Sequence, residues 1–106
     1  MEMEFMHIGA PVKKPAANET YNDGMKVWIG DVEKHPFKME TLRFEPDSWL
    51  AQEIQTQTHV AVKVPNLKEA LQLCEKVLLE PVVIDDHLTL AFAIRDGVVM
   101  EFMEFH

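Results

Sequence analysis

The two halves of the chain carry the same short pattern, a histidine opening one strand-like apolar run and a glutamate inside a later one. Residues 6–10 (MHIGA) align with residues 58–62 (THVAV), and residues 39–44 (METLRF) align with residues 100–105 (MEFMEF). The polar residues that recur are, in chain order, His7, Glu40, His59 and Glu101. This order predicts two similar halves whose four polar side chains converge on one divalent metal ion.

Length and composition indicate one globular domain, residues 1–106. Apolar residues make up 47% of the chain and charged residues 26%, which is typical of a protein with a hydrophobic core. The formal net charge is −8, and lysine and arginine form no cluster. A nucleic acid or an anionic membrane would require a basic surface, so neither partner is expected.

The chain shows no pattern of an export signal or a membrane span. Glu2 and Glu4 interrupt its start, and no run approaches the roughly 20 apolar residues of a membrane helix. The single cysteine, Cys74, cannot form a disulfide within the chain, which suits a reducing compartment. We therefore expect a cytoplasmic protein.

The first half is expected to contain three strands and no helix. Alternating or apolar runs predict strands at residues 3–10, 25–30 and 38–44. Residues 11–24 hold two prolines and an Asp-Gly turn pair without apolar periodicity, which predicts a loop. Residues 49–57 have little apolar content and are interpreted as a linker.

The second half predicts a strand, a helix and three further strands. Asn66 is a good N-cap, and Pro81 should stop the helix that follows it. Strands are expected at residues 59–64, 82–85, 88–94 and 98–105, with a hairpin turn at Asp96-Gly97. The helix is predicted from one apolar stripe, formed by Leu67, Ala70, Leu71, Cys74, Val77 and Leu78. The fold class is therefore α+β.

Strand alternation tests whether the four polar residues can meet. Val60, Val62 and Val64 share one face of their strand and suit packing against the helix. His59 then lies on the opposite face, beside the small residue Ala61, and His7 likewise lies beside Gly9. Small neighbours leave room for a ligand, so both histidines are expected to line the same open space.

Both glutamates lie on otherwise apolar strand faces. Glu40 shares its face with Leu42 and Phe44, and Glu101 shares its face with Phe105. Burial of a carboxylate is costly unless it is paired or bound to a cation. Two imidazoles and two carboxylates suit Zn, Ni, Co, Mn or Fe(II), so the four residues are predicted metal ligands. The alternative is that each is a solvated or locally satisfied residue.

This arrangement resembles the vicinal oxygen chelate superfamily, which includes glyoxalases, bleomycin-resistance proteins, epimerases and extradiol dioxygenases. The resemblance is carried by residues 6–11 (MHIGAP), 59–70 (HVAVKVPNLKEA) and 96–101 (DGVVME). It implies paired βαβββ modules whose curled mixed sheet surrounds a cup. It also implies that His7, Glu40, His59 and Glu101 are the metal ligands.

The first module departs from this pattern. His7 and Glu40 are 33 positions apart, whereas His59 and Glu101 are 42 positions apart. An abbreviated module at residues 1–47, lacking its helix, is therefore expected beside a complete module at residues 57–106. The missing helix would leave apolar surface for a partner, and the resemblance implies a homodimer.

The resemblance implies a metal-dependent lyase or isomerase for a small 2-oxo or 2-hydroxy carbonyl compound. In that reading Glu40 or Glu101 abstracts a proton and the metal stabilises the enediolate. A non-catalytic small-ligand binding protein is the alternative, and a dioxygenase is a third reading that the extra glutamate counts against. No segment resembles the arginine-containing segments by which glyoxalases hold glutathione. The side chains expected to contact substrate are Trp28, Leu42, Phe44 and Phe105.

Overall fold

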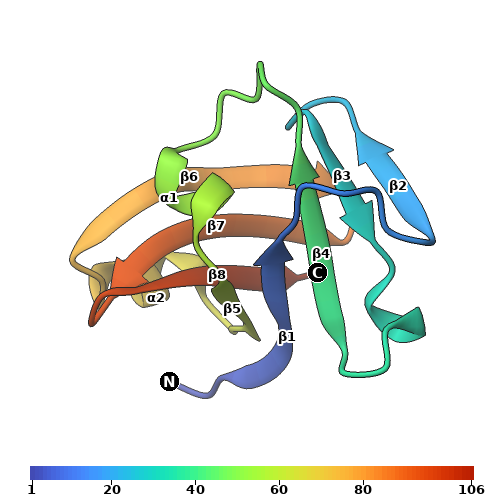
Figure 1. Cartoon of the computed structure of the whole chain (residues 1–106). Coiled ribbons are helices and arrows are strands. Elements are labelled where there is room, and N and C mark those ends of the chain that lie inside the picture. Colours follow the sequence, from blue (N-terminus) through green and yellow to red (C-terminus); the bar gives the residue numbers. More distant parts are fainter.

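Eight strands form one mixed sheet, shown in Figure 1 in a computed structural model that describes residues 1–106. The strands follow the order β2-β3-β4-β1-β5-β8-β7-β6 across the sheet. Their bounds are β1 Glu4–Pro11, β2 Glu19–Asn22, β3 Val27–Gly30, β4 Met39–Phe44, β5 His59–Lys63, β6 Lys76–Asp85, β7 Leu88–Arg95 and β8 Val98–Phe105. The helices are α1 Gln52–Thr56, α2 Leu67–Gln72 and the 3-10 turn η1 Val32–Lys34.

Strands β1 and β5 form the middle of the sheet. They pair with each other antiparallel, while β1 pairs with β4 and β5 pairs with β8 in parallel. The outer strands on both sides are joined antiparallel. The sheet is strongly curled, and β6, β7 and β8 run across the direction of β1 and β4 (Figure 1). The curl creates a concave side on which residues from both halves of the chain meet.

The two sides of the sheet have separate hydrophobic cores. Val62 and Val64 pack with Leu67 and Ala70 of α2, as strand alternation predicts for the face away from His59. The concave side holds a second buried cluster: Met25, Val27, Leu42, Leu50, Ile54, Leu79, Leu90, Phe92 and Val99. This second cluster surrounds the candidate site.

The predicted helix is right at its start and wrong at its end. The Asn66 side chain accepts a hydrogen bond from the backbone N–H of Glu69, so it is the N-cap. The helix ends at Gln72, however, and Val77 and Leu78 belong to β6. The apolar pattern over residues 76–79 is compatible with the period of a helix and with that of a strand. These residues form a strand because they pair with β7. Pro81 is tolerated inside β6 because this strand lies at the sheet edge and its register is irregular there.

Two short elements are absent from the predicted organisation. Strand β2 lies within the predicted loop 11–24, and helix α1 lies within the predicted linker 49–57. Both are too short to produce a measurable period, and α1 buries only Ile54. The segment between β1 and β2 contains no helix, and the 3-10 turn η1 lies between β3 and β4.

The hairpin between β7 and β8 has the geometry that its sequence predicts. Asp96 has φ 52° and Gly97 has φ 78°, which are the two left-handed positions of a type I′ turn. This turn keeps the pairing of β7 with β8 in register along eight residue pairs, including Phe92 with Glu101. The hairpin therefore fixes where Glu101 lies along the concave side.

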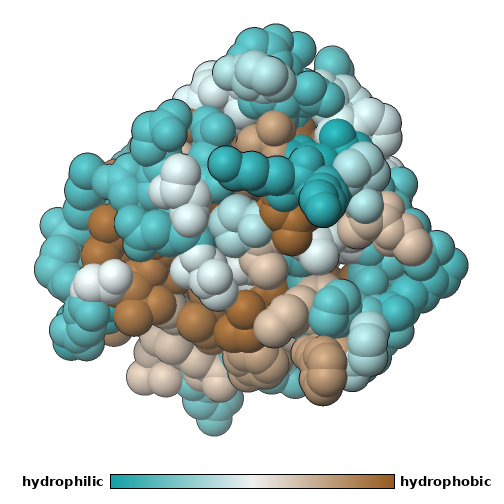
Figure 2. Space-filling view, viewed as in Figure 1, coloured by the Kyte–Doolittle hydropathy of each residue, from teal (hydrophilic) through white to brown (hydrophobic).

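The surface carries exposed apolar side chains among many polar ones. Figure 2 shows apolar atoms gathered over the lower part of the viewed face, with hydrophilic atoms above and around them. Phe5 is 60% exposed and Phe37 79%. A partner that covers such side chains stays a prediction. Neither helix has the length or apolar character needed to cross a bilayer.

Candidate metal centre

Two neighbouring rows of the sheet position the four predicted ligands. In one row Gly9 pairs with Glu40 on β4 and with His59 on β5. In the other row Ala61 pairs with His7 on β1 and with Glu101 on β8. Each row thus holds a histidine, a small residue and a glutamate side by side. The two halves of the chain contribute to both rows, so the site is formed only when the halves are joined.

The small residue in the first row is required by the position of His59. A Cβ atom at Gly9 would lie 1.9 Å from the Cε1 atom of the His59 ring. Real Cβ atoms essentially never approach another heavy atom so closely, and the buried ring is held by its neighbours. Phe92 packs edge-on against it, with ring centroids 5.0 Å apart. Gly9 therefore leaves the space that the imidazole occupies.

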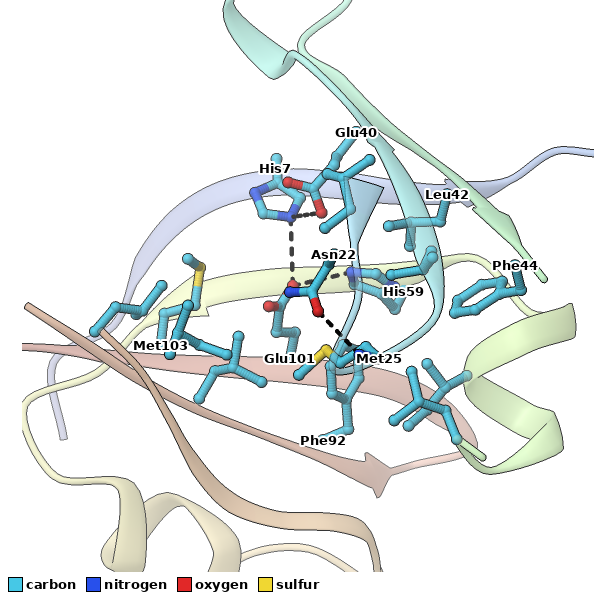
Figure 3. A pocket seen from close by; sticks show the side chains of 17 residues that line it. His7, Asn22, Met25, Glu40, Leu42, Phe44, His59, Phe92, Glu101 and Met103 are labelled. Carbon is cyan, nitrogen blue, oxygen red and sulfur yellow. Dashed lines mark hydrogen bonds and ion pairs between the residues drawn. The ribbon is translucent and has the colours of Figure 1, made fainter. Parts of the chain in front are cut away.

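The four side chains lie close enough to hold one ion. Their nearest ligand atoms all lie within 4.8 Å of one another. The Nε2 atom of His7 lies 3.4 Å from an oxygen of Glu40 and 3.4 Å from an oxygen of Glu101. The Nε2 atom of His59 lies 3.1 Å from the same Glu101 oxygen (Figure 3). The structure thus brings together all four residues that the sequence singles out.

The four clustered side chains differ in burial. His59 is 1% exposed, and His7 and Glu101 are each 5% exposed. The Glu40 side chain retains 20% exposure. Glu101 contacts both histidines, whereas Glu40 contacts His7 alone. Glu40 therefore lies at the accessible side of the cluster and Glu101 at its buried centre.

Proximity of opposite charges shifts two pKa values in the metal-free cluster. Burial alone would lower the pKa of His7, but the carboxylates of Glu101 and Glu40 outweigh burial and raise it from 6.5 to about 9. Burial alone would raise the pKa of Glu101, but the contacts with His59 and His7 outweigh it and lower that pKa. Without a metal, a proton on His7 thus compensates part of the buried negative charge.

The donor set fits a divalent cation. The Nε2 atom of His7 is buried and, despite the two carboxylates at 3.4 Å, has no aligned hydrogen-bond partner. No lysine or arginine lines the cavity beside the cluster, so a protonated His7 is the only side-chain cation that accompanies the two carboxylates. Two imidazole nitrogens and two carboxylates are ligands that zinc and other first-row metals accept. The cluster can therefore hold a metal ion through these four residues.

The cluster forms one end of a cavity of about 160 Å³. Twelve of the 17 residues that line this cavity are hydrophobic, so an apolar chamber adjoins the polar cluster. Leu42 and Phe44, two of the expected substrate contacts, are among them. Figure 3 shows Leu42 and Phe44 to the right of the cluster, and Met25 and Phe92 below it.

The other two expected substrate contacts lie outside the cavity. Trp28 is flanked in β3 by Val27 and Ile29, which line the cavity, so its own side chain points to the opposite face. There its indole N–H donates to Glu45. Phe105 lies near the end of β8, beyond the cavity, where Lys63 approaches its ring. The predicted roles of Trp28 and Phe105 therefore have no support from their positions.

Several cavity residues come from the two elements that the sequence did not reveal. Asn22 ends β2, and Leu50 and Ile54 come from the connection that contains α1. The Gln55 side chain donates hydrogen bonds to the carbonyls of Ser48 and Leu50, which fixes this connection over the cavity. Ile54 is the one buried residue of α1, so the sequence offers no apolar period from which this helix could be predicted.

Comparison with known proteins identifies the fold but no family. No protein-family model matches the chain, and no curated protein matches it. Among solved structures, the chain is similar to the crystal structure of hypothetical protein BH1468 from Bacillus halodurans C-125. The TM-score is 0.65 at 20% sequence identity, over 98% of this chain and 95% of that one. The curled mixed sheet thus occurs in another protein over nearly its whole length.

Proposed function

We propose that the chain is a metal-dependent lyase or isomerase of the vicinal oxygen chelate type. Its substrate would be a small 2-oxo or 2-hydroxy carbonyl compound. The observation that carries the proposal is the buried cluster of two histidines and two glutamates at the end of an apolar cavity. The equivalent rows around Gly9 and Ala61 support a fold of paired modules, of which the first lacks its helix.

In this proposal His7, His59 and Glu101 hold a divalent metal in the buried part of the cluster. When bound, such an ion acts as a Lewis acid toward two adjacent substrate oxygens. Glu40 is the residue that moves the proton, because it is the most exposed member and touches only one histidine. A carboxylate at the cavity wall can take a proton from one carbon and return it to the neighbouring carbon.

The surrounding side chains would support this chemistry by excluding water. Leu42 and Phe92 are each 5% exposed and line the cavity next to the cluster. Charge interactions are stronger in an enclosed apolar site than in water. The same apolar lining favours one other function, that of a binding protein that sequesters a small ligand without converting it.

Metal content provides the first test. After reconstitution with Zn, Ni, Co or Mn, we expect one equivalent of one of these metals per chain, measured by elemental analysis. His59→Ala should lose the metal, while His87→Ala should retain it, because His87 is exposed and is not one of the four clustered residues. A protein that takes up none of the four metals in stoichiometric amount would refute the proposal.

Proton exchange separates an enzyme from a binding protein. The metal-loaded protein should exchange the α-proton of a 2-hydroxy carbonyl compound for deuterium in D₂O, followed by NMR. Glu40→Gln should abolish this exchange and still bind metal through the other three residues. Metal binding without exchange over a broad panel of such compounds would favour the binding protein.

A further inference from the structure

We infer that the ligand of this site is a vicinal-oxygen compound with one compact apolar group, the size of a benzene ring, and no second charged group. The two adjacent oxygens rest on the proposed function. The apolar group and the absence of further charge follow from the cavity itself, from its size, its walls and the charges around it.

The size of the cavity limits the apolar group. Its volume is about 160 Å³. An apolar protein cavity on the order of 150 Å³ holds one benzene molecule. Sites for drug-sized ligands are larger, roughly 300 Å³ or more. The whole cavity, which includes the space at the cluster, therefore limits the apolar group to at most about six carbon atoms, as estimated from that benzene-sized cavity.

The walls of the cavity are apolar on both sides. Leu90 and Phe92 face it from β7, and they are 7% and 5% exposed. Leu50 and Ile54 close it from the connection between β4 and β5, at 5% and 1% exposure. A hydrocarbon group placed between these walls is removed from water where it contacts them, which is favourable in proportion to its buried area.

The charges around the cavity disfavour a second ionised group. A divalent metal ion and the carboxylates of Glu40 and Glu101 carry no net charge together, and no lysine or arginine lines the cavity. Asn22 is the one polar lining side chain outside the cluster; its amide oxygen accepts a hydrogen bond from Met25 N–H, and its neutral NH2 group can donate a hydrogen bond but carries no charge. A phosphate or carboxylate on the far end of a ligand would thus be buried without a cationic partner.

Binding of alkyl hydroxamates tests this inference, because a hydroxamate presents two adjacent oxygens to a metal ion. Their affinities for the metal-loaded protein can be measured by titration calorimetry. From acetohydroxamate to hexanohydroxamate we expect affinity to rise about fourfold for each added methylene, the value for full burial of a CH₂ group. Octanohydroxamate should gain nothing more. The monohydroxamate of adipic acid, with the same six carbons and a terminal carboxylate, should lose the gain.

A substitution in the cavity wall provides an independent check. Ile29 lines the cavity and is only half-buried, so a larger side chain is tolerated there. Ile29→Phe should lower the affinity for hexanohydroxamate at least tenfold and leave acetohydroxamate binding unchanged. Trp28→Phe, on the other face of the same strand, should change neither affinity.

The outcomes distinguish this inference from the proposed function. A protein that holds metal and binds all the hydroxamates equally, or that binds the adipic derivative as tightly as hexanohydroxamate, overturns the inference alone. Metal uptake without any hydroxamate binding also overturns it. A protein that takes up no metal overturns the proposed function, and the inference with it.

Discussion

Metal binding to this cluster should release one proton, and its affinity should therefore depend on pH. The proton is the one on His7, whose pKa the two neighbouring carboxylates raise to about 9 in the metal-free protein. A metal ion and a proton compete for the same imidazole nitrogen. At pH 7 this competition weakens metal binding by a factor of about 100, equivalent to about 2.7 kcal/mol.

Titration calorimetry in two buffers of different ionisation enthalpy measures the protons released for each metal bound. At pH 7 we expect close to one proton per metal. The apparent affinity should rise about tenfold per pH unit between pH 7 and pH 8.5, and it should level off above the His7 pKa of about 9.

His87→Ala is the matched control, because it removes an exposed histidine that takes no part in the cluster. It should leave both the proton count and the pH dependence unchanged. Binding that releases no proton at pH 7 and has the same affinity at pH 7 and pH 9 would show that His7 is not protonated beside the carboxylates. The electrostatic account of the empty cluster would then be wrong.

Three further results are expected. In the presence of a chelator, the free energy of unfolding measured with urea should be about 3 kcal/mol lower at pH 10 than at pH 6. The raised pKa of His7 stabilises the fold fully below pH 6.5, the pKa of this histidine in the unfolded chain, and the contribution is lost as pH rises through about 9. The lowered pKa of Glu101 causes a loss of stability in the opposite direction, below about pH 4.5, and a flat profile from pH 6 to pH 10 would contradict the His7 prediction. Gly9→Ala should lower the unfolding free energy by about 1–3 kcal/mol and the metal affinity at least tenfold, because the added methyl group would overlap the His59 ring. The control Gly24→Ala should change little, because its methyl group would meet only Asn22, at 3.5 Å. Equal metal affinity in both variants would refute the packing argument. Asn66→Ala should lower the unfolding free energy by about 1 kcal/mol through loss of the α2 cap, with unchanged metal binding, and a loss of metal binding would show that α2 supports the site.

The cluster could be predicted from the sequence because it depends on local alternation and on two similar halves. His59 and Ala61 had to share a face once Val60, Val62 and Val64 were assigned to the helix side, and the structure confirms this. The turn at Asp96-Gly97 could be predicted equally well, because few residue pairs adopt left-handed conformations at two successive positions. Patterns enforced by sterics within a few residues were thus sufficient to place the ligands.

The cavity walls could not be predicted in the same way, because they depend on long-range packing. Residues 76–79 fit a helical period as well as a strand, and only pairing with β7 decides between them. Ile54 is 1% exposed within a helix of five residues, which is too short to show a period. Trp28 is a predicted substrate contact, but its neighbours Val27 and Ile29 line the cavity and Trp28 itself does not.

The two halves contribute similar residues but unequal environments, and this inequality bears on the division of labour that we propose. Glu101 lies in the half that has its helix α2, contacts both histidines and is 5% exposed. Glu40 lies on β4, contacts His7 alone and keeps 20% side-chain exposure. A residue that moves a proton must contact the substrate and must be able to be both protonated and deprotonated. A buried carboxylate paired with two histidines resists protonation. In the proposed function, the more exposed Glu40 is thus free to move the proton while the buried Glu101 anchors the ion.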